Sequence, residues 1–460
     1  MTLIKSISGI RGTIGGKPGE SLSPVDIVKF SAAFGTWIIR RSKYPRPVII
    51  IGRDARTTGS LVSNLVIATL QGLGIDVTDL GMATTPTVEI AVTGSSASGG
   101  IVITASHNPA SWNALKLLNE RGEFLSASDG NEVLLNASAE DFYFAPYDKL
   151  GTVKSDRSWG EKHIDMILKL RQVDVKAIKK AGFTVAVDCI NSVGSLILPD
   201  LLKRLGVKNI HLLNGLADGN FAHNPEPLPE NLTGISILVK EKKADVGFVV
   251  DPDVDRLAFV CEDGSMFGEE YTLVAVSDYI LSFTRGNTVS NLSSTRALKD
   301  VTEKYGAKYF TSAVGEVNVV EEMKARDAII GGEGNGGIIF PELHYGRDAL
   351  VGIALFLSQL ARSGEKCTEL RKRYPSYFIA KKKITLVPGT DVDLILNEVK
   401  KAFSDQKIDL RDGIRIDYEK GWVQIRKSNT EPIIRIYAEG ATENEAESLA
   451  GKVIGIVKKE

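Results

Sequence analysis

A serine that follows a predicted buried strand is the first candidate for chemistry. Residues 101–103 (Ile-Val-Ile) are three consecutive β-branched residues and predict a strand buried on both faces. Small and polar residues follow as far as Pro109, which excludes helical geometry at Asn108. Because α/β folds bind ligands beyond the carboxyl ends of strands, Ser106 is a candidate nucleophile and His107 a titratable neighbour. The alternative is an ordinary exit from a strand into a turn.

Three carboxylates at alternate positions form the second candidate. Asp251, Asp253 and Asp255 follow an apolar stretch and offer hard oxygen ligands of the kind that Mg²⁺ prefers. A calcium EF-hand is excluded because its sixth position would be Arg256 instead of glycine, and residues 257–261 predict another strand. A solvated acidic turn is the alternative. Carboxylates this close repel one another strongly unless a cation lies among them.

Two later loops carry groups that suit a phosphorylated sugar. Residues 426–432 (Arg-Lys-Ser-Asn-Thr-Glu-Pro), together with Arg435, combine guanidinium groups with short donors, as binding of a phosphate dianion requires. The alternative is a polar hairpin with solvated arginines. Residues 331–337 contain five glycines, which let a ligand approach the backbone, and Glu333 and Asn335 are candidate contacts for sugar hydroxyls. Residues 314–316 (Val-Gly-Glu) precede this loop by one predicted helix.

Two isolated cations are further candidates for anion binding. Arg11 lies between glycines near the start of the chain, and Lys116 follows Ser106 by ten residues. For either residue alone, an exposed and solvated charge is the simpler interpretation.

Composition limits the classes of partner and compartment. The 460 residues include 56 basic and 57 acidic side chains, so the net charge of −1 argues against general binding of nucleic acid or anionic membranes. The three cysteines are widely spaced and predict neither a disulfide framework nor a metal site. No signal-peptide core and no apolar run of membrane-spanning length are present, so we expect a cytoplasmic protein. Composition makes no prediction of the oligomeric state.

A strand–helix–strand pattern occurs three times and predicts the architecture. Its strands are expected at residues 48–51 and 75–80, 183–187 and 209–213, and 288–292 and 307–310, and each intervening helix ends near a glycine. Such units require parallel pairing and right-handed crossovers. From residue 384 onward, strands and helices alternate in mixed order, and a capping box at Thr442 and Glu445 begins the last helix.

The predicted fold class is therefore α/β, with three related α/β domains and mixed sheets plus a smaller C-terminal α+β domain. We expect boundaries near residues 150, 254 and 372. The domains then cover residues 1–150, 151–254, 255–372 and 373–460, and each contributes one of the four loops to a central cleft. A nucleophile, a metal triad, a sugar loop and a phosphate loop together indicate an enzyme that moves a phosphoryl group on a phosphorylated sugar.

With these motifs in this order, the chain resembles the α-D-phosphohexomutases over essentially its whole length. Residues 104–109 (Thr-Ala-Ser-His-Asn-Pro), with Asn113 and Lys116, are similar to the phosphoserine loop of that family. Residues 251–256 (Asp-Pro-Asp-Val-Asp-Arg) are similar to its metal loop. The family comprises phosphoglucomutases, phosphomannomutases and phosphoglucosamine mutases.

The resemblance implies a reaction and a set of roles. Hexose 6-phosphate and hexose 1-phosphate would interconvert through phosphorylated Ser106 and a hexose 1,6-bisphosphate. One Mg²⁺ would be bound by Asp251, Asp253, Asp255 and a phosphoserine oxygen. Arg11, Lys116 and His107 would assist proton and phosphate handling, with Arg256 near the metal. The implied substrate-binding residues are Gly315, Glu316, Glu333, Asn335, Arg426, Ser428, Asn429, Thr430 and Arg435.

The sugar loop departs from the pattern of many members. They have Glu-x-Ser-Gly-His, whereas residues 333–337 here are Glu-Gly-Asn-Gly-Gly, without a histidine. This version is similar to that of archaeal-type phosphohexomutases, and residues 314–316 and 428–432 resemble phosphoglucosamine mutases. We therefore expect phosphoglucosamine mutase activity, with phosphomannose and phosphoglucose as alternatives. A metal-dependent sugar-phosphate phosphatase and a non-catalytic sugar-phosphate sensor are more remote interpretations.

Overall fold

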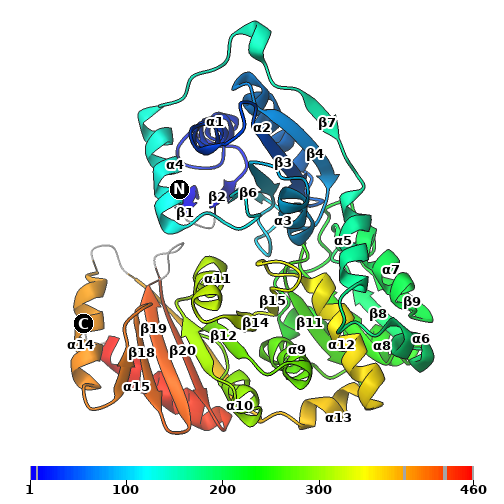
Figure 1. Cartoon of the computed structure of the whole chain (residues 1–460). Helices are drawn as coiled ribbons and strands as arrows, with labels where there is room; N and C mark the ends of the chain where they lie inside the picture. The colour runs from blue at the N-terminus through cyan, green and yellow to red at the C-terminus, as the bar shows by residue number, and fades with distance from the viewer. Residues whose placement is uncertain (1, 7–8, 387–389, 428–432, 458–460) are drawn as a thin grey trace. The chain divides into compact units, whose positions relative to one another are not determined.

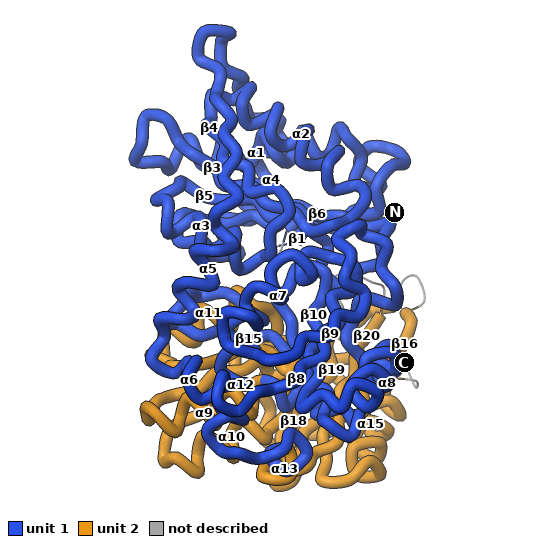
Figure 2. The backbone as a smooth tube through the Cα atoms, turned by 90° about the vertical axis from the view of Figure 1, so that its right-hand side faces the viewer, with its two compact units in different colours: residues 1–272, 336–370 blue, residues 273–335, 371–460 orange. Residues whose placement is uncertain are grey.

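A computed structural model describes residues 2–6, 9–386, 390–427 and 433–457. The chain forms two compact units. The first contains Met1–Thr272 and Gly336–Leu370, and the second contains Leu273–Asn335 and Arg371–Glu460 (Figure 2). Among the described residues, no helix is both long and apolar enough to cross a membrane.

The first unit opens with a seven-stranded mixed sheet in the order β1-β2-β6-β5-β3-β4-β7. Its strands are β1 (Ile4–Ser6), β2 (Gly9–Thr13), β3 (Val48–Arg53), β4 (Asp76–Met82), β5 (Gly99–Ile103), β6 (Trp112–Leu118) and β7 (Val153–Ser155). Strand β3 pairs in parallel with β4 and β5, whereas β6 runs antiparallel to β5 and β2.

Apolar residues on both faces of β3 and β5 explain why these strands lie at the centre of the sheet. Ile49 and Ile101 pack into the core that contains residues of helices α1 (Pro24–Arg41), α2 (Gly59–Gly72) and α4 (Ala127–Ala139). Ile50 and Val102, on the opposite face, pack with residues of helix α3 (Thr85–Gly94) and with Trp159. Figure 1 shows α1, α2 and α4 gathered on one side of this sheet and α3 on the other. Because β3 and β5 run parallel to each other, their carboxyl ends lie at the same edge of the sheet. The loops that follow them, including the loop that carries Ser106, begin at that edge.

A four-stranded sheet in the order β11-β10-β8-β9 carries the acidic loop in the same unit. Its strands are β8 (Thr184–Asp188), β9 (Asn209–Leu213), β10 (Val246–Val250) and β11 (Leu257–Cys261). Strand β8 pairs in parallel with β9 and β10, and β11 returns antiparallel to β10. The pairing of β10 with β11 crosses the predicted boundary at residue 254, and the domain boundaries stay a prediction.

The remaining elements of the first unit are mostly helices. They are α5 (Trp159–Leu168), α6 (Val175–Ala181), α7 (Gly194–Leu205), α8 (Thr233–Lys242), α12 (Ala349–Ser363), the short strand β15 (Gly337–Ile339) and the 3₁₀ turns η1 (Tyr147–Lys149) and η2 (Pro229–Asn231). Helix α13 (Cys367–Lys372) follows at the end of this part of the chain.

The second unit contains a parallel sheet and an antiparallel sheet. In the first, β12 (Asn287–Asn291) pairs in parallel with β13 (Tyr309–Ser312) and β14 (Ala328–Glu333). The second is five-stranded, in the order β16-β20-β19-β18-β17. Its strands are β16 (Phe378–Thr385), β17 (Lys407–Asp409), β18 (Ile414–Tyr418), β19 (Gly421–Lys427) and β20 (Ile433–Gly440). The helices are α9 (Glu269–Phe283), which begins before Leu273, α10 (Ala297–Lys304), α11 (Glu316–Ala325), α14 (Val392–Ala402) and α15 (Glu443–Val457).

All three predicted strand–helix–strand repeats are confirmed as parallel pairs, β3 with β4, β8 with β9 and β12 with β13. Helix α7 ends at Gly206 in left-handed geometry, as the glycine signal predicts. The capping box before α15 is also present, because Glu445 N–H donates to Thr442 Oγ1 and Thr442 N–H donates to Glu445 Oε2. The predicted α/β fold class is confirmed.

Candidate active site

Ser106 and the acidic loop meet within the first unit. Ser106 lies three residues beyond β5, has a φ of +49° and is only 6% exposed. Its Oγ donates a hydrogen bond of 2.7 Å to Asp251 Oδ2, although the two residues are 145 positions apart in the chain. Asp251 itself follows directly after β10. The predicted nucleophile and the predicted metal loop are thus brought together by the carboxyl ends of two strands from different sheets.

The three aspartates form one buried cluster. Asp251, Asp253 and Asp255 are each 0% exposed, and one oxygen of each lies within 4.8 Å of the others. Oδ1 of Asp253 and Oδ1 of Asp255 are buried and accept no hydrogen bond from any part of the chain that the structure describes. Burial, and then the neighbouring charges of Asp255 and Asp253, raise the pKa of Asp251. Buried carboxylate oxygens that converge without partners fit a hard divalent cation such as Mg²⁺.

Two cations balance part of this charge. Lys116 Nζ lies 2.6 Å from Asp253 Oδ2 and 3.2 Å from Asp255 Oδ2. Burial opposes the ammonium charge, but Asp253 and Asp255 outweigh it and raise the pKa of Lys116. Arg347 donates to Asp255 Oδ2 at 2.6 Å. Burial disfavours ionised Asp255, yet Arg347 and Lys116 hold the pKa of Asp255 below its ordinary value.

Arg347 and Thr85 were missed by the sequence reasoning. Thr85 donates its Oγ1 hydrogen to Asp253 Oδ2 at 2.5 Å and its backbone N–H to the Asp253 carbonyl. The sequence signal available for both residues was their place at a helix start, Thr85 as the first residue of α3 and Arg347 just before the N-cap Asp348 of α12. That signal locates helix ends but does not identify what they contact.

Several arginine side chains lie close enough to His107, the neighbour of Ser106, to act on its charge. The charge of Arg256, then burial and then Arg11, hold the pKa of His107 well below its ordinary value, so the imidazole is neutral. Burial, followed by the charges of Arg256 and Arg347, lowers the pKa of Arg11. Arg256 Nε is buried and has no hydrogen-bond partner among the described residues. Because these positive groups repel one another, a bound anion would relieve the repulsion, as a phosphate group would.

The predicted sugar loop lies in the second unit. Glu333 ends β14, and its Oε1 accepts hydrogen bonds from Asn291 Nδ2 at 2.8 Å and from Gly315 N–H at 3.1 Å. Glu316 begins α11 and is 9% exposed, and Asn335 Nδ2 lies 3.5 Å from Glu333 Oε2. The structure therefore brings the four predicted sugar-contact residues of this unit into one group.

The predicted phosphate loop is described only in part. Arg426 on β19 lies directly opposite Arg435 on β20, so both side chains project from the same face of the sheet. Arg426 Nε lies 4.0 Å from Asp412 Oδ2. Ser428, Asn429 and Thr430 lie outside the described residues.

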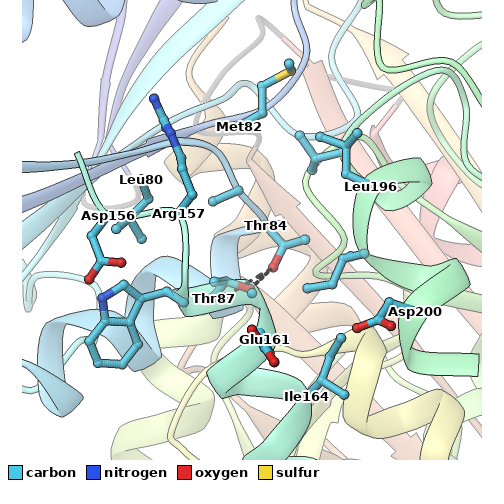
Figure 3. A pocket seen from close by; sticks show the side chains of 15 residues that line it. Leu80, Met82, Thr84, Thr87, Asp156, Arg157, Glu161, Ile164, Leu196 and Asp200 are labelled. Atoms are coloured by element: carbon cyan, nitrogen blue, oxygen red, sulfur yellow. Dashed lines mark hydrogen bonds between the residues drawn. The ribbon is translucent and has the colours of Figure 1, made fainter. Parts of the chain in front are cut away.

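A cavity elsewhere in the first unit contains none of these side chains. Its volume is about 220 Å³, and its walls include Trp159, Ile164 and Leu196 (Figure 3). Thr84 and Thr87 at the start of α3 also line it, one and two residues from the Thr85 that contacts Asp253. The candidate site is therefore the charged cluster around Ser106, because that cluster combines a nucleophile with convergent carboxylates and cations.

Comparison with known families fits this geometry. Four family models match in succession, the three α/β/α domains and the C-terminal domain of phosphoglucomutase/phosphomannomutase, over residues 3–144, 161–264, 268–377 and 387–456. The chain belongs to the phosphoglucomutase/phosphomannomutase family. It is thus a phosphohexomutase, an isomerase that transfers a phosphoryl group within a hexose phosphate. Members of this family generally use Mg²⁺, which the buried aspartates fit.

Individual relatives differ in their named sugars. The chain is 37% identical over 441 residues to a Thermococcus kodakarensis protein named phosphoglucomutase/phosphomannomutase, covering 95% of each chain. It is 32% identical over 464 residues to a Sulfurisphaera tokodaii protein named phosphoglucosamine/phosphogalactosamine mutase, covering 98% of each. A solved phosphohexomutase-family structure from Burkholderia thailandensis has the same fold, with a TM-score of 0.85, 23% identity and coverage of 99% of this chain and 97% of that one.

Proposed function

We propose that this phosphohexomutase carries its phosphoryl group on Ser106 and acts preferentially on glucosamine phosphates. The observation that carries the proposal is the 2.7 Å hydrogen bond from Ser106 Oγ to Asp251, within a buried group of three carboxylates. A serine hydroxyl beside carboxylates that could hold a metal, with arginine and lysine charges nearby, is arranged for phosphoryl transfer. Asp251, Asp253 and Asp255 would hold one Mg²⁺. When bound there, the metal would neutralise negative charge on the transferring phosphoryl group.

The reaction proceeds in two transfers that balance. In the first, the bond between phosphorus and Ser106 Oγ breaks while the anomeric hydroxyl at C1 of hexose 6-phosphate forms a bond to phosphorus. This yields hexose 1,6-bisphosphate. The sugar hydroxyl loses its proton and Ser106 Oγ ends protonated, in its hydrogen bond to Asp251. In the second, the bisphosphate has turned so that its 6-phosphate faces Ser106. The bond between phosphorus and the sugar O6 breaks while Ser106 Oγ bonds to phosphorus, the proton lost by Oγ is gained by O6, and hexose 1-phosphate leaves. Hexose 1,6-bisphosphate is thus both intermediate and activator.

The cations around Ser106 have distinct tasks in this scheme. Arg11 and Arg256 bind the oxygens of the transferring phosphoryl group, since their mutual repulsion falls when a dianion lies between them. Lys116 stays an ammonium and holds Asp253 and Asp255 in place. His107 is neutral, and its Nδ1 lies 3.4 Å from Ser106 Oγ, where it orients the hydroxyl.

The preference for glucosamine rests on the second unit. Glu316 and Glu333 are buried carboxylates of the kind that bind an ammonium group at the sugar C2 position. Asn335 replaces the serine of the common sugar loop.

The anchor proposed for the non-reacting phosphate consists of Arg426 and Arg435, which lie on one face of their sheet, and of Ser428, Asn429 and Thr430, which lie outside the described residues. We further propose that the enzyme works in the cytoplasm.

Two measurements test the proposal. Intact-mass analysis after incubation with a hexose 1,6-bisphosphate is expected to show one phosphate on the wild type and none on Ser106→Ala. Turnover by Ser106→Ala at a rate comparable to that of the wild type would refute the phosphoserine carrier. For the sugar, ³¹P NMR with glucosamine, glucose, mannose and N-acetylglucosamine 6-phosphates is expected to give the highest kcat/KM with glucosamine. A higher value for glucose or mannose would refute the preference.

A further inference from the structure

Arg56 is a fully buried arginine that contacts the backbone of the Ser106 loop. Its side chain is 0% exposed. Its NH2 group donates to the carbonyl oxygens of Ser106 at 2.6 Å and Asn108 at 2.7 Å, and its NH1 group donates to those of Pro109 at 2.7 Å and Trp112 at 3.0 Å. One guanidinium group thus binds three carbonyl groups of the nucleophile loop and that of Trp112, the first residue of β6.

These carbonyl groups need such a partner because the loop has little regular structure. Residues 104–111 lie between β5 and β6 and belong to neither strand. Ser106 adopts the left-handed backbone region, at a φ of +49°, which costs a residue with a Cβ atom free energy. Buried carbonyl oxygens without donors would add to that cost. The five N–H donors of a planar guanidinium match this geometry, whereas a lysine ammonium has only three.

The charge of Arg56 is compensated by a residue that also connects to Ser106. Arg56 Nε donates to Asp54 Oδ2 at 3.0 Å, and Thr104 Oγ1 donates to the same oxygen at 2.7 Å. The Ser106 N–H in turn donates to Thr104 Oγ1 at 2.9 Å. The ring of Phe221 covers the guanidinium, with its centroid 4.9 Å from the central carbon. Ser106 is therefore held on both sides, at its N–H through Thr104 and at its C=O through Arg56.

We propose that Arg56 is a positioning residue for phosphoryl transfer. It fixes the left-handed backbone at Ser106, so that Oγ points at Asp251 both before and after transfer. This inference rests on the proposed role of Ser106 as the phosphoryl carrier. Because all five N–H donors of Arg56 are occupied by groups of the chain and its side chain is 0% exposed, it acts through the loop and not on the substrate.

The test compares Arg56→Met and Arg56→Lys with a matched control, Arg53→Met. Arg53 lies three residues earlier and donates to the Asp54 carbonyl oxygen instead of to the nucleophile loop. The readouts are the single-turnover rate of Ser106 phosphorylation by glucose 1,6-bisphosphate, followed by intact mass, and steady-state kcat and KM. A merely structural role would lower the fraction of protein that reacts but leave the rate of the reacting fraction unchanged.

We expect displacement of the nucleophile to slow phosphorylation and kcat by about 100-fold in Arg56→Met and about 10-fold in Arg56→Lys. The KM should stay within about twofold of the wild type, because Arg56 lies behind the loop and contacts no substrate. Arg53→Met should phosphorylate at the wild-type rate. Wild-type rates in folded Arg56→Met and Arg56→Lys would overturn the proposal.

Further variants keep every outcome informative. If Arg56→Met does not fold, Arg56→Lys decides. If neither folds, Asp54→Asn decides, because it replaces the carboxylate that holds Arg56 Nε by a weaker neutral acceptor while keeping the guanidinium, and a wild-type rate there refutes the positioning role. Ser106→Ala separates this inference from the proposed function. Activity in Ser106→Ala would refute the carrier itself, whereas inactive Ser106→Ala with fully active Arg56 variants would refute only the role of Arg56.

Discussion

Lys116 and a divalent cation should compete for the negative charge of the same carboxylates, Asp253 and Asp255. Lys116 Nζ lies 2.6 Å from Asp253 Oδ2 and 3.2 Å from Asp255 Oδ2, and all three side chains are buried. Replacing Lys116 by methionine keeps a chain of similar length but leaves these carboxylates with less positive charge nearby. Without metal, Lys116→Met should therefore be destabilised, and its affinity for Mg²⁺ should rise.

The size of both effects follows from the geometry. Removing one partner of a buried ion pair costs about 3–5 kcal/mol. For a protein of 460 residues, with an unfolding entropy of about 2.1 cal/mol/K per residue, that corresponds to a fall in Tm of roughly 3–5 °C. Two unit charges 4 Å apart interact by about 4 kcal/mol at an effective dielectric constant near 20, so loss of the ammonium should tighten Mg²⁺ binding by at least about 10-fold. At a Mg²⁺ concentration of 100 times Kd, binding should return about 2.7 kcal/mol of stability.

The assay combines thermal unfolding with isothermal titration calorimetry. Tm of the wild type and of Lys116→Met is measured in EDTA and across a Mg²⁺ series, and Kd is measured on the same EDTA-treated samples. Lys154→Met, an exposed lysine on β7, is the matched control and should change neither quantity. Weaker Mg²⁺ binding by Lys116→Met, or a loss of stability that saturating Mg²⁺ does not reduce, would refute the reasoning.

Three further predictions concern the metal, the phosphate anchor and pH. Asp253→Asn should lower kcat by on the order of 10²-fold, and full activity after EDTA treatment would contradict a metal site. Arg426→Ala should lower kcat/KM by about 10- to 150-fold in both directions of the reaction, and steady-state kinetics showing loss in one direction only would exclude a shared anchor. Burial disfavours charged His223, but its hydrogen bond to Asp188 outweighs burial and raises the pKa of His223. The stability from this pair is therefore fully present below about pH 6.5 and is lost as pH rises through the folded-state pKa. His223→Gln should lower Tm by roughly 1 °C at pH 6, since a part-exposed pair contributes about 1 kcal/mol, and should have no effect at pH 9. Equal effects at both pH values would exclude the pair.

The sequence by itself determined the local chemistry. Ser106 and the three aspartates each lie just beyond a short run of β-branched or aromatic residues, and such runs become central strands because both of their faces bury apolar surface. The carboxyl end of a strand is a local property, so the nucleophile and the acidic loop could both be found without coordinates. The three strand–helix–strand repeats were predictable for the same reason, because periodicity and helix-ending glycines act within a few residues.

Only the tertiary structure decided which groups pair with which. Arg347 and Thr85 contact the acidic loop, and Arg56 contacts the Ser106 loop, yet each is a single residue far from its partners in the chain. Hydrophobic patterns specify which face of an element is buried, but not which distant cation approaches a given carboxylate. The raised pKa of Lys116 and the lowered pKa of His107 likewise depend on charges that packing brings together. The physical reason is that electrostatic interactions act across space, over a few ångströms, and these separations are fixed by the packing of whole sheets and helices.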